Sequence, residues 1–244
     1  MTRVVDSSRS RLPCGIEKID EGLRASFGEV PHGIIPLGNK RNPLDELVFI
    51  QLSVRTPERE YEETYRAFRR LVGGRWERLL SLDAERAITV LRRGGMAHVK
   101  VHRLMETFSM LRVRFGRVTL APLRAMSDAD AEALLLGLPG VGKKVARCIL
   151  LYSLDRDVFP VDTHCFRVLD RLRLVPPGRK YRNAHDDIQS LIPPPLRRSL
   201  HVNLVRHGRT TCTPRHPRCS SCVLLPCCPT GQQRMRELGG DAGT

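Results

Sequence analysis

The stretch Leu138-Pro139-Gly140-Val141-Gly142-Lys143-Lys144 joins two segments with helical periodicity, 128–136 and 143–154. Its glycines let the backbone turn tightly and approach another surface closely. The N–H groups of such a turn, together with those of the next helix's first turn, form a site for an anion such as a phosphate. The stretch therefore predicts a hairpin that contacts the backbone of nucleic acid, and a plain helix–helix turn is the alternative.

Two lysines follow directly, in the first turn of the second helix. The helix dipole disfavours cations there by about 0.3–1 kcal/mol, and a local rule broken without local benefit often marks function. A bound phosphate would pair with Lys143. The positive helix end disfavours the ammonium form of Lys144, and an uncharged amine is a nucleophile. The apolar face of Val145, Ile149 and Tyr152 should be buried, which leaves Lys144 near its edge.

A carboxylate stands directly before another predicted helix, in Val161-Asp162-Thr163-His164. On local sequence Asp162 is an N-cap, and we expect Phe166, Leu169 and Leu172 to be the buried positions of the helix. A carboxylate held in this way can also accept a proton or stabilise positive charge on a sugar whose base departs. The two roles are compatible, because a cap fixes the carboxylate in place.

Eight cysteines are present, and five of them lie between residues 212 and 228. Cys212, Cys219, Cys222 and Cys228 have the spacing C-x6-C-x2-C-x5-C, with which one compact loop can wrap an iron–sulfur cluster. Structural zinc sites usually pair two short knuckles, so zinc is the alternative, followed by four unligated cysteines. Cys227 is not expected to be a ligand. Because the N-terminus resembles no secretion signal, we do not expect a disulfide framework.

The chain is strongly basic, with a formal net charge of +15 over 244 residues. This charge favours a polyanionic partner, and a basic solvated surface without a partner is the alternative. Aromatic residues make up only 5%, which argues against a single-strand binder built on stacking and favours recognition of a duplex. No apolar run approaches the roughly 20 residues of a membrane span. The N-terminal residues read as a short tail.

Helical periodicity dominates, and no run alternates convincingly, so the sequence predicts an all-α protein. Thr56-Pro57 and Ser127-Asp128-Ala129-Asp130 read as helix starts, and Gly73-Gly74, Gly94-Gly95 and Gly116 read as helix stops. Segments 28–43 and 174–180 read as connectors, the chain after His207 as loop, and 232–244 as a tail. The helices are predicted at about 16–26, 43–54, 58–72, 83–93, 97–114, 128–136, 143–154, 163–173, 181–191 and 195–206.

Together, LPGVGKK, VDTH and the cysteine loop preceded by His207-Gly208-Arg209 resemble the endonuclease III family of helix-hairpin-helix DNA glycosylases, over residues 44–228. The resemblance implies a six-helix barrel domain with the hairpin at 45–157. It implies a second helical domain, which holds the iron–sulfur cluster, from 1–44 and 158–244. It also implies a DNA-binding groove between the two domains, double-stranded DNA as the partner, a 4Fe-4S cluster, no soluble cofactor and a monomer. A bacterial cytoplasm is the simplest compartment, and a nucleus or organelle the alternative.

Carried over residue by residue, the resemblance implies that Lys144 is the catalytic lysine and Asp162 the catalytic aspartate. Relatives that remove a base without cutting the strand have another residue at the lysine position. Lys144 therefore implies a bifunctional glycosylase and abasic-site lyase, with oxidised pyrimidines as the usual substrates. The alternatives are a monofunctional mismatch or uracil-type glycosylase and a non-catalytic DNA-binding iron–sulfur protein.

The resemblance also assigns residues that touch DNA. Arg55 and Met96 stand where relatives have a Gln and a Leu that fill the void left by the flipped nucleotide, and Leu136 stands where relatives have a Glu near the base pocket. The basic residues of the cysteine loop and its approach would contact phosphate, with Arg206, Arg209, Arg215 and Arg218 as candidates. The hairpin contacts would come from Gly140, Val141, Gly142 and Lys143.

Overall fold

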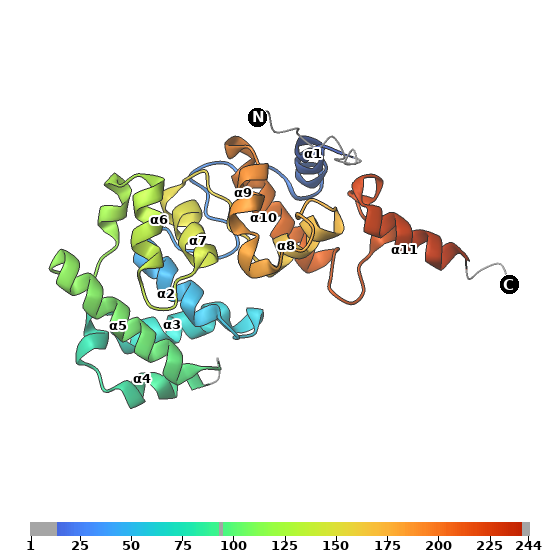
Figure 1. The fold of residues 1–244 in the computed structure, drawn as a ribbon. Helices are drawn as coiled ribbons and strands as arrows, with labels where there is room; N and C mark the ends of the chain where they lie inside the picture. Colours follow the sequence, from blue (N-terminus) through green and yellow to red (C-terminus); the bar gives the residue numbers. More distant parts are fainter. Residues whose placement is uncertain (1–13, 93–94, 241–244) are drawn as a thin grey trace. The chain divides into compact units, whose positions relative to one another are not determined.

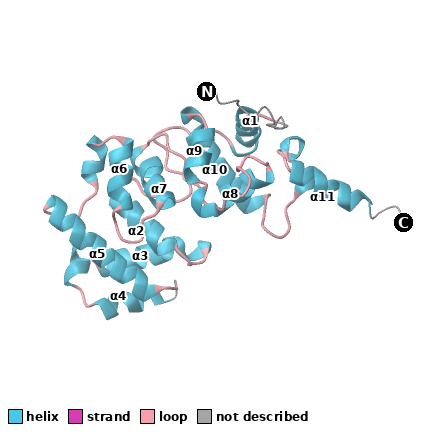
Figure 2. Cartoon of the chain, in the orientation of Figure 1, coloured by secondary structure: helices cyan, strands magenta, loops and turns pink. Residues whose placement is uncertain are grey.

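The computed structural model describes residues 14–92 and 95–240. Within these ranges the chain is helical without strands, which confirms the predicted all-α class (Figure 2). The expected N-terminal tail at 1–13, the helix stop at Gly94 and the last residues, 241–244, lie outside the described ranges.

The chain divides into two compact units. The continuous unit spans 32–160, and the discontinuous unit combines 1–31 with 161–244. The continuous unit thus begins at residue 32 rather than at the expected 45, because the connector before the first of its helices is bound to it. Ser153 Oγ donates to the Lys40 carbonyl (2.7 Å), Lys40 Nζ pairs with Glu62 (2.6 Å), and the Gly33 N–H donates to Asp155 (3.2 Å).

Six α-helices form the described part of the continuous unit (Figure 1). They are α2 (Pro43–Ser53), α3 (Tyr61–Leu71), α4 (Ala84–Leu91), α5 (Ala97–Phe115), α6 (Asp128–Leu136) and α7 (Lys143–Leu154). Helix α2 packs against α3, α5 and α7 and is buried over most of its length. Asn42 caps it by accepting from the Leu44 and Asp45 N–H groups, and Pro43 occupies the first turn. A helix that is buried on nearly all sides in this way is a core helix.

Aromatic side chains fill the core of the continuous unit. The Trp76 ring lies 5.9 Å from Tyr65, 6.1 Å from Phe68 and 6.4 Å from Phe108, measured between ring centroids. The Trp76 indole N–H donates to Asp45 on α2, and Arg69 donates to the same carboxylate oxygen. The single tryptophan therefore has the polar partner that a buried indole requires.

The described part of the discontinuous unit has five α-helices, with α10 packed against α1 and α8. Asp20 on α1 is fully buried, accepts from Ser199 on α10 (2.6 Å) and pairs with Arg24 (2.9 Å). Burial raises the pKa of Asp20, and these two partners act against the rise. The five helices are α1 (Ile16–Phe27), α8 (Thr163–Arg171), α9 (His185–Leu191), α10 (Pro194–Thr210) and α11 (Pro229–Gly240).

Several predicted boundaries need correction. The predicted helix 58–72 splits into a 3₁₀ turn at Glu58–Glu60 followed by α3, and the predicted helix 181–191 splits in the same way into a 3₁₀ turn and α9. Helix α10 continues to Thr210, where the sequence predicted loop. The predicted tail from 232 is wrong, because α11 occupies 229–240 and the Gln232 side chain bonds the Leu225 and Pro226 carbonyls (3.2 and 2.9 Å).

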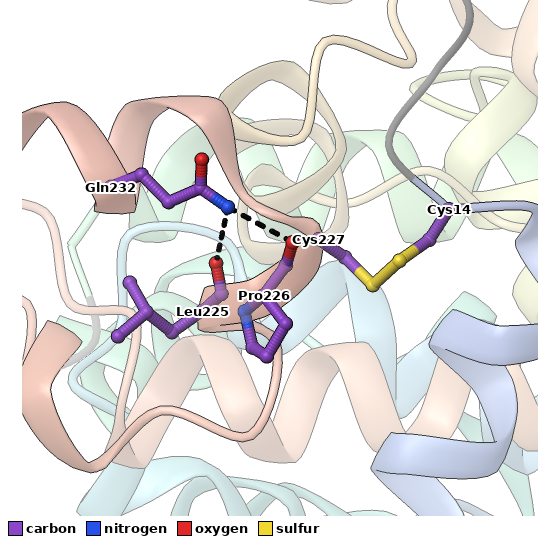
Figure 3. The surroundings of a disulfide bond; sticks show 5 residues. All are labelled: Cys14, Leu225, Pro226, Cys227 and Gln232. Atoms are coloured by element: carbon purple, nitrogen blue, oxygen red, sulfur yellow. Dashed lines mark hydrogen bonds between the residues drawn. A yellow bond between two sulfur atoms is a disulfide. The ribbon is translucent and has the colours of Figure 1, made fainter.

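A disulfide joins Cys14 to Cys227, across 213 residues of sequence (Figure 3). The sequence analysis expected no disulfide framework, and this pair departs from that expectation. The bond connects the N-terminal segment of the discontinuous unit to its C-terminal segment. It also occupies the thiol of Cys227, which agrees with the prediction that Cys227 is not a ligand.

Replacing Cys14 by Ser should lower the stability of the discontinuous unit in non-reducing buffer. A cross-link over so long a loop restricts the unfolded chain, which contributes up to about 5 kcal/mol in the chain-entropy account. Urea unfolding followed by circular dichroism measures the change. Dithiothreitol should bring the unmodified protein to the level of Cys14→Ser, and equal stability of the two proteins without reductant would contradict the cross-link.

Candidate functional site

The glycine stretch forms the predicted turn between α6 and α7. Gly140 has a φ of 72°, in the left-handed region, and a Cβ added there would lie 2.8 Å from Cδ of Arg103. Both facts explain the glycine. The Gln51 side chain on α2 donates to the Pro139 carbonyl (3.1 Å), and the Val141 side chain is buried. The hairpin is therefore held against the core of the continuous unit from both sides.

The first turn of α7 follows the hairpin with an extended Gly142 as its N-cap. Glycine has no side chain that could cap the first N–H groups, and Lys143 and Lys144 are both partly exposed there. Val145 is partly exposed too, so its predicted burial is wrong. Ile149 and Tyr152 are buried as predicted, within a buried stretch that runs from Ala146 to Ser153 because α2 and α6 both pack on this helix.

A buried carboxylate lies near Lys144. Glu46 on α2 is fully buried; its Oε2 accepts the Lys40 N–H at 2.5 Å, and its Oε1 has no hydrogen-bond partner in the described part of the chain. Burial raises the pKa of Glu46 to about 8, while the Lys40 N–H and the charges of Lys144 and Lys40 act in the opposite direction. The sequence analysis missed Glu46, although a carboxylate directly before the apolar run 47–50 is its signal.

Arg55 and Met96 lie at two helix ends that meet. Both residues are exposed and both have left-handed backbone, with φ of 54° and 55°. A Cβ added to Gly95 would lie 3.4 Å from the Arg55 carbonyl oxygen, so the two turns are in contact. The sequence analysis expected Arg55 and Met96 to share one role, and the structure places the turns that carry them in contact. Leu136, at the end of α6, is 38% exposed.

In the discontinuous unit, Asp162 caps α8 as predicted. Its Oδ1 accepts the Cys165 N–H at 2.7 Å. The adjacent Val161 is buried, and its carbonyl accepts the Tyr181 hydroxyl (3.1 Å). The carboxylate is thereby fixed at the start of the helix. Leu169 and Leu172 are buried as predicted, together with Cys165 and Val168. Phe166 is only partly buried and contacts the Tyr181 ring, so its predicted burial is wrong.

The four cysteines with the predicted ligand spacing line one cavity in the discontinuous unit. Its other walls come from α8, α10 and α11. Hydrogen-bond donors point at the sulfurs: Arg171 Nη1 lies 3.1 Å from Cys212 Sγ, and the Gly231 N–H donates to Cys228 Sγ at 3.2 Å. Donors to sulfur stabilise thiolates and tune a bound metal centre. The donor set of the cavity therefore fits a thiolate-bound group.

The cavity also disfavours charge on the sulfurs when they are alone. Burial raises the pKa values of Cys222 and Cys228, and negative charge on the neighbouring cysteines raises them further. A cationic group would reverse this cost. Burial lowers the pKa of His207 to about 4, so its ring is neutral at pH 7, with Nε2 at 3.6 Å from Cys222 Sγ. In the described residues no three His, Cys, Asp or Glu side chains converge as ligands of a single ion.

The arginines near the cysteine loop differ in their exposure. Arg206 donates to the Phe27 carbonyl (2.9 Å) and to Asn203, so it connects α10 to α1 within the discontinuous unit. Arg209 is partly exposed in the last turn of α10, and Arg215 and Arg218 are exposed in the loop. No helix in the described ranges combines the length and the hydropathy needed to cross a membrane.

Comparison with known proteins adds a family relationship, although no protein-family model matches the chain. The chain is 30% identical to endonuclease III of Treponema pallidum over 214 residues, which are 88% of this chain and 94% of that protein. It is 30% identical to endonuclease III of Escherichia coli (strain K12) over 150 residues, 62% of this chain. A DNA glycosylase homologue of Arabidopsis thaliana is 28% identical over 73% of this chain. The matches span only 66% of the E. coli protein and 58% of the plant protein.

Solved structures share the fold. A non-covalent endonuclease III–DNA complex has a TM-score of 0.77 at 21% identity and covers 91% of this chain and 97% of that one. A thermostable thymine-DNA glycosylase has a TM-score of 0.68 at 18% identity, over 89% of this chain and 94% of that one.

Glu46 should make the stability of the continuous unit depend on pH. The folded protein keeps a proton on Glu46 between its ordinary pKa of 4.5 and about 8, where the unfolded chain has lost it, so stability falls as pH rises through this window. Glu46→Gln removes the titration. The difference in unfolding free energy between Glu46→Gln and the unmodified protein should therefore grow from pH 5 to pH 9 by about 4 kcal/mol. Urea titrations at several pH values measure it, with the exposed Glu63→Gln as the control. A difference that does not vary with pH would refute this.

Proposed function

Because the chain belongs to the endonuclease III family, we propose that it is a DNA glycosylase that removes damaged bases from double-stranded DNA. The proposed substrates are oxidised pyrimidines. We propose further that it is bifunctional, so that a lysine Schiff base forms at the damaged site and β-elimination cuts the strand. The observation that carries the proposal is the position of Lys144, partly exposed in the first turn of α7 behind the glycine hairpin.

The hairpin serves to hold the DNA backbone. Of the predicted hairpin contacts, the Val141 N–H already donates to the Leu138 carbonyl (3.1 Å), so Gly140, Gly142 and the first turn of α7 offer the N–H groups. The helix dipole favours a phosphate there. Lys143 pairs with the same phosphate, and the exposed side chain of Arg103 lies against the hairpin. The net charge of +15 favours binding along the duplex, and Arg209 adds a phosphate contact from the discontinuous unit. These contacts position DNA without reading its sequence.

Base removal requires the damaged nucleotide to leave the stack, which costs a few kcal/mol. Arg55 and Met96 offset this cost by entering the void, since apolar wedges and basic side chains hold bases apart in other DNA-bending proteins. Left-handed backbone at both residues supports the assignment, because strained backbone at exposed positions is often kept for function.

The chemistry is assigned to Lys144 and Asp162. The Lys144 amine attacks C1′ of the sugar, the bond from C1′ to the base breaks, and the departing base takes up the proton that Asp162 passes on from the amine. The Asp162 carboxylate, held by the Cys165 N–H, accepts the proton that the amine loses and stabilises positive charge on the sugar. Opening of the sugar ring gives a Schiff base between Nζ and C1′. Loss of a proton from C2′ then expels the 3′ phosphate, and water releases the lysine.

We assign the cysteine cavity to a 4Fe-4S cluster, held by Cys212, Cys219, Cys222 and Cys228. The donors to sulfur from Arg171 and Gly231 support this, as does the spacing of the four cysteines, which supplies all ligands from one loop. The cluster would cross-link α8, α10 and the loop before α11 and has no step in the reaction.

Lys144→Ala should abolish the covalent intermediate. In borohydride trapping with duplexes that carry thymine glycol, dihydrouracil or an abasic site, we expect the protein–DNA band to fall by at least about a hundredfold. Lys143→Ala is the matched control. It should keep the band at saturating protein, weaken binding and lower the slope of binding against salt by about one.

Other outcomes of the trapping experiment identify the alternatives. Base loss that appears only after alkali would mean a monofunctional glycosylase, and duplexes with uracil or thymine opposite guanine would then show the substrate. Duplex binding without base loss or a band would mean a non-catalytic DNA-binding protein.

Cys219→Ala should remove the brown colour, the absorbance near ~400 nm and about four iron atoms per chain. Cys227→Ser is the control that should retain them, because Cys227 is paired with Cys14. Elemental analysis that finds one zinc and no iron in the unmodified protein would overturn the cluster assignment.

A further inference from the structure

The sequence predicted that Thr56 caps a helix, and this prediction is wrong. Its Oγ1 donates instead to the Leu52 carbonyl (2.7 Å), in the last turn of α2, and its N–H donates to the Ser53 carbonyl (3.1 Å). These bonds close a turn at the end of α2 with Arg55 at its exposed tip. A left-handed conformation costs a non-glycine residue about 1–2 kcal/mol, so the neighbouring contacts must hold Arg55 in it.

A buried lysine completes this turn. Lys100, in the first turn of α5, is only 5% exposed. Its Nζ donates to the Leu52 carbonyl (2.8 Å) and to Thr56 Oγ1 (2.9 Å), so it contacts the turn on both sides of Arg55. The carbonyl belongs to the negative end of α2, where a cation is favoured.

The other end of the same residue fixes Met96. The Lys100 N–H donates to the Met96 carbonyl at 3.0 Å, in the first turn of α5. Met96 is left-handed and 40% exposed, and the backbone of Gly95 lies against the Arg55 carbonyl. One residue thus bonds the turn that carries Arg55 through its side chain and the turn that carries Met96 through its backbone.

A lysine is a costly choice for a buried position. Burial lowers the pKa of Lys100 to about 8, which shows how strongly the site disfavours the ammonium form. Met or Leu would fill similar space without this cost. A polar group kept in a core where an apolar one would be more stable is explained when it fixes one arrangement among several. The arrangement that Lys100 would fix is that of Arg55 and Met96, which are both exposed and left-handed.

We propose that Lys100 is a positioning residue that locks Arg55 and Met96 side by side, so that both enter the duplex when a nucleotide is flipped out. The inference rests on the proposed function of these two residues as the void-filling pair. Lys100 touches neither DNA nor the reacting atoms in this account. Lys100 restricts the conformations of Arg55 and Met96 before DNA binds. The pair therefore loses less conformational entropy on binding.

The test measures base unstacking separately from chemistry. Duplexes carry an abasic site and 2-aminopurine opposite it, whose fluorescence rises when the base is unstacked, and kcat and KM are measured on the same duplexes. Lys100→Met keeps the length and apolar contacts of the side chain but cannot donate. We expect it to lower kcat about tenfold and to remove most of the fluorescence rise, with KM changed less than threefold because the phosphate contacts remain.

A double-mutant cycle shows whether Lys100 acts through the pair. In an Arg55→Ala, Met96→Ala background, Lys100→Met should change kcat and fluorescence less than twofold. If Lys100→Met instead lowers kcat and fluorescence in this background by the same factors as in the unmodified protein, Lys100 acts elsewhere and the proposal is wrong. If the paired alanine variant alone changes nothing, the void-filling role fails and the inference fails with it. If that variant loses unstacking while Lys100→Met does not, the void-filling role stands and only the role of Lys100 is refuted.

Thr56→Val provides a second route if Lys100→Met does not fold. It keeps the shape of the side chain and removes the hydroxyl that joins Lys100 to the turn. We expect it to lower the fluorescence rise and kcat in the same direction by about threefold, with KM unchanged. Full unstacking in a folded Thr56→Val protein would overturn the proposal.

Discussion

The Gln51 side chain on α2 donates to the Pro139 carbonyl and fixes the glycine hairpin to a helix that is buried over most of its length. A hairpin that binds phosphate through backbone N–H groups has little energy of its own to hold its shape, so its geometry depends on this support. The first turn of α7, with Lys143 and Lys144, follows from the hairpin. The other end of the α2–α7 pair is also fixed, because Ser153 Oγ on α7 donates to the Lys40 carbonyl just before α2.

The same helix also carries the buried polar groups that distinguish this site from a plain apolar core. In the described part of the chain one Glu46 oxygen has no hydrogen-bond partner, while the charge of Lys144 acts on this carboxyl group. The Leu52 carbonyl accepts a hydrogen bond from the Lys100 ammonium. Burying the Glu46 and Lys100 side chains costs stability that apolar side chains would not. Each lies beside proposed functional residues, Glu46 near Lys144 and Lys100 beside the turns of Arg55 and Met96. Buried polar side chains that lower stability thus occur where the proposed functional residues must be held in position.

Local patterns were enough to predict much of the fold and of the site. The helix class, the hairpin, the Ser127 and Asp162 caps and the gathering of four cysteines around one cavity all follow from short stretches of sequence, and the structure agrees with them. The failures involve partners distant in sequence. Thr56 serves Lys100 rather than a helix start, Cys14 finds Cys227, and the buried faces of α7 and α8 depend on which helices cover them. Periodicity carries no information about such pairings.

The central claim is that Lys144 forms the covalent bond to the sugar. The most direct measurement is to digest the borohydride-reduced protein–DNA adduct and locate the modified amine by mass spectrometry. The account predicts that the sugar remnant is on Lys144 and on no other residue. A remnant on Lys143, on Lys100 or on the N-terminal amine would contradict it, because the nucleophile would then lie outside the position that the hairpin and α2 prepare.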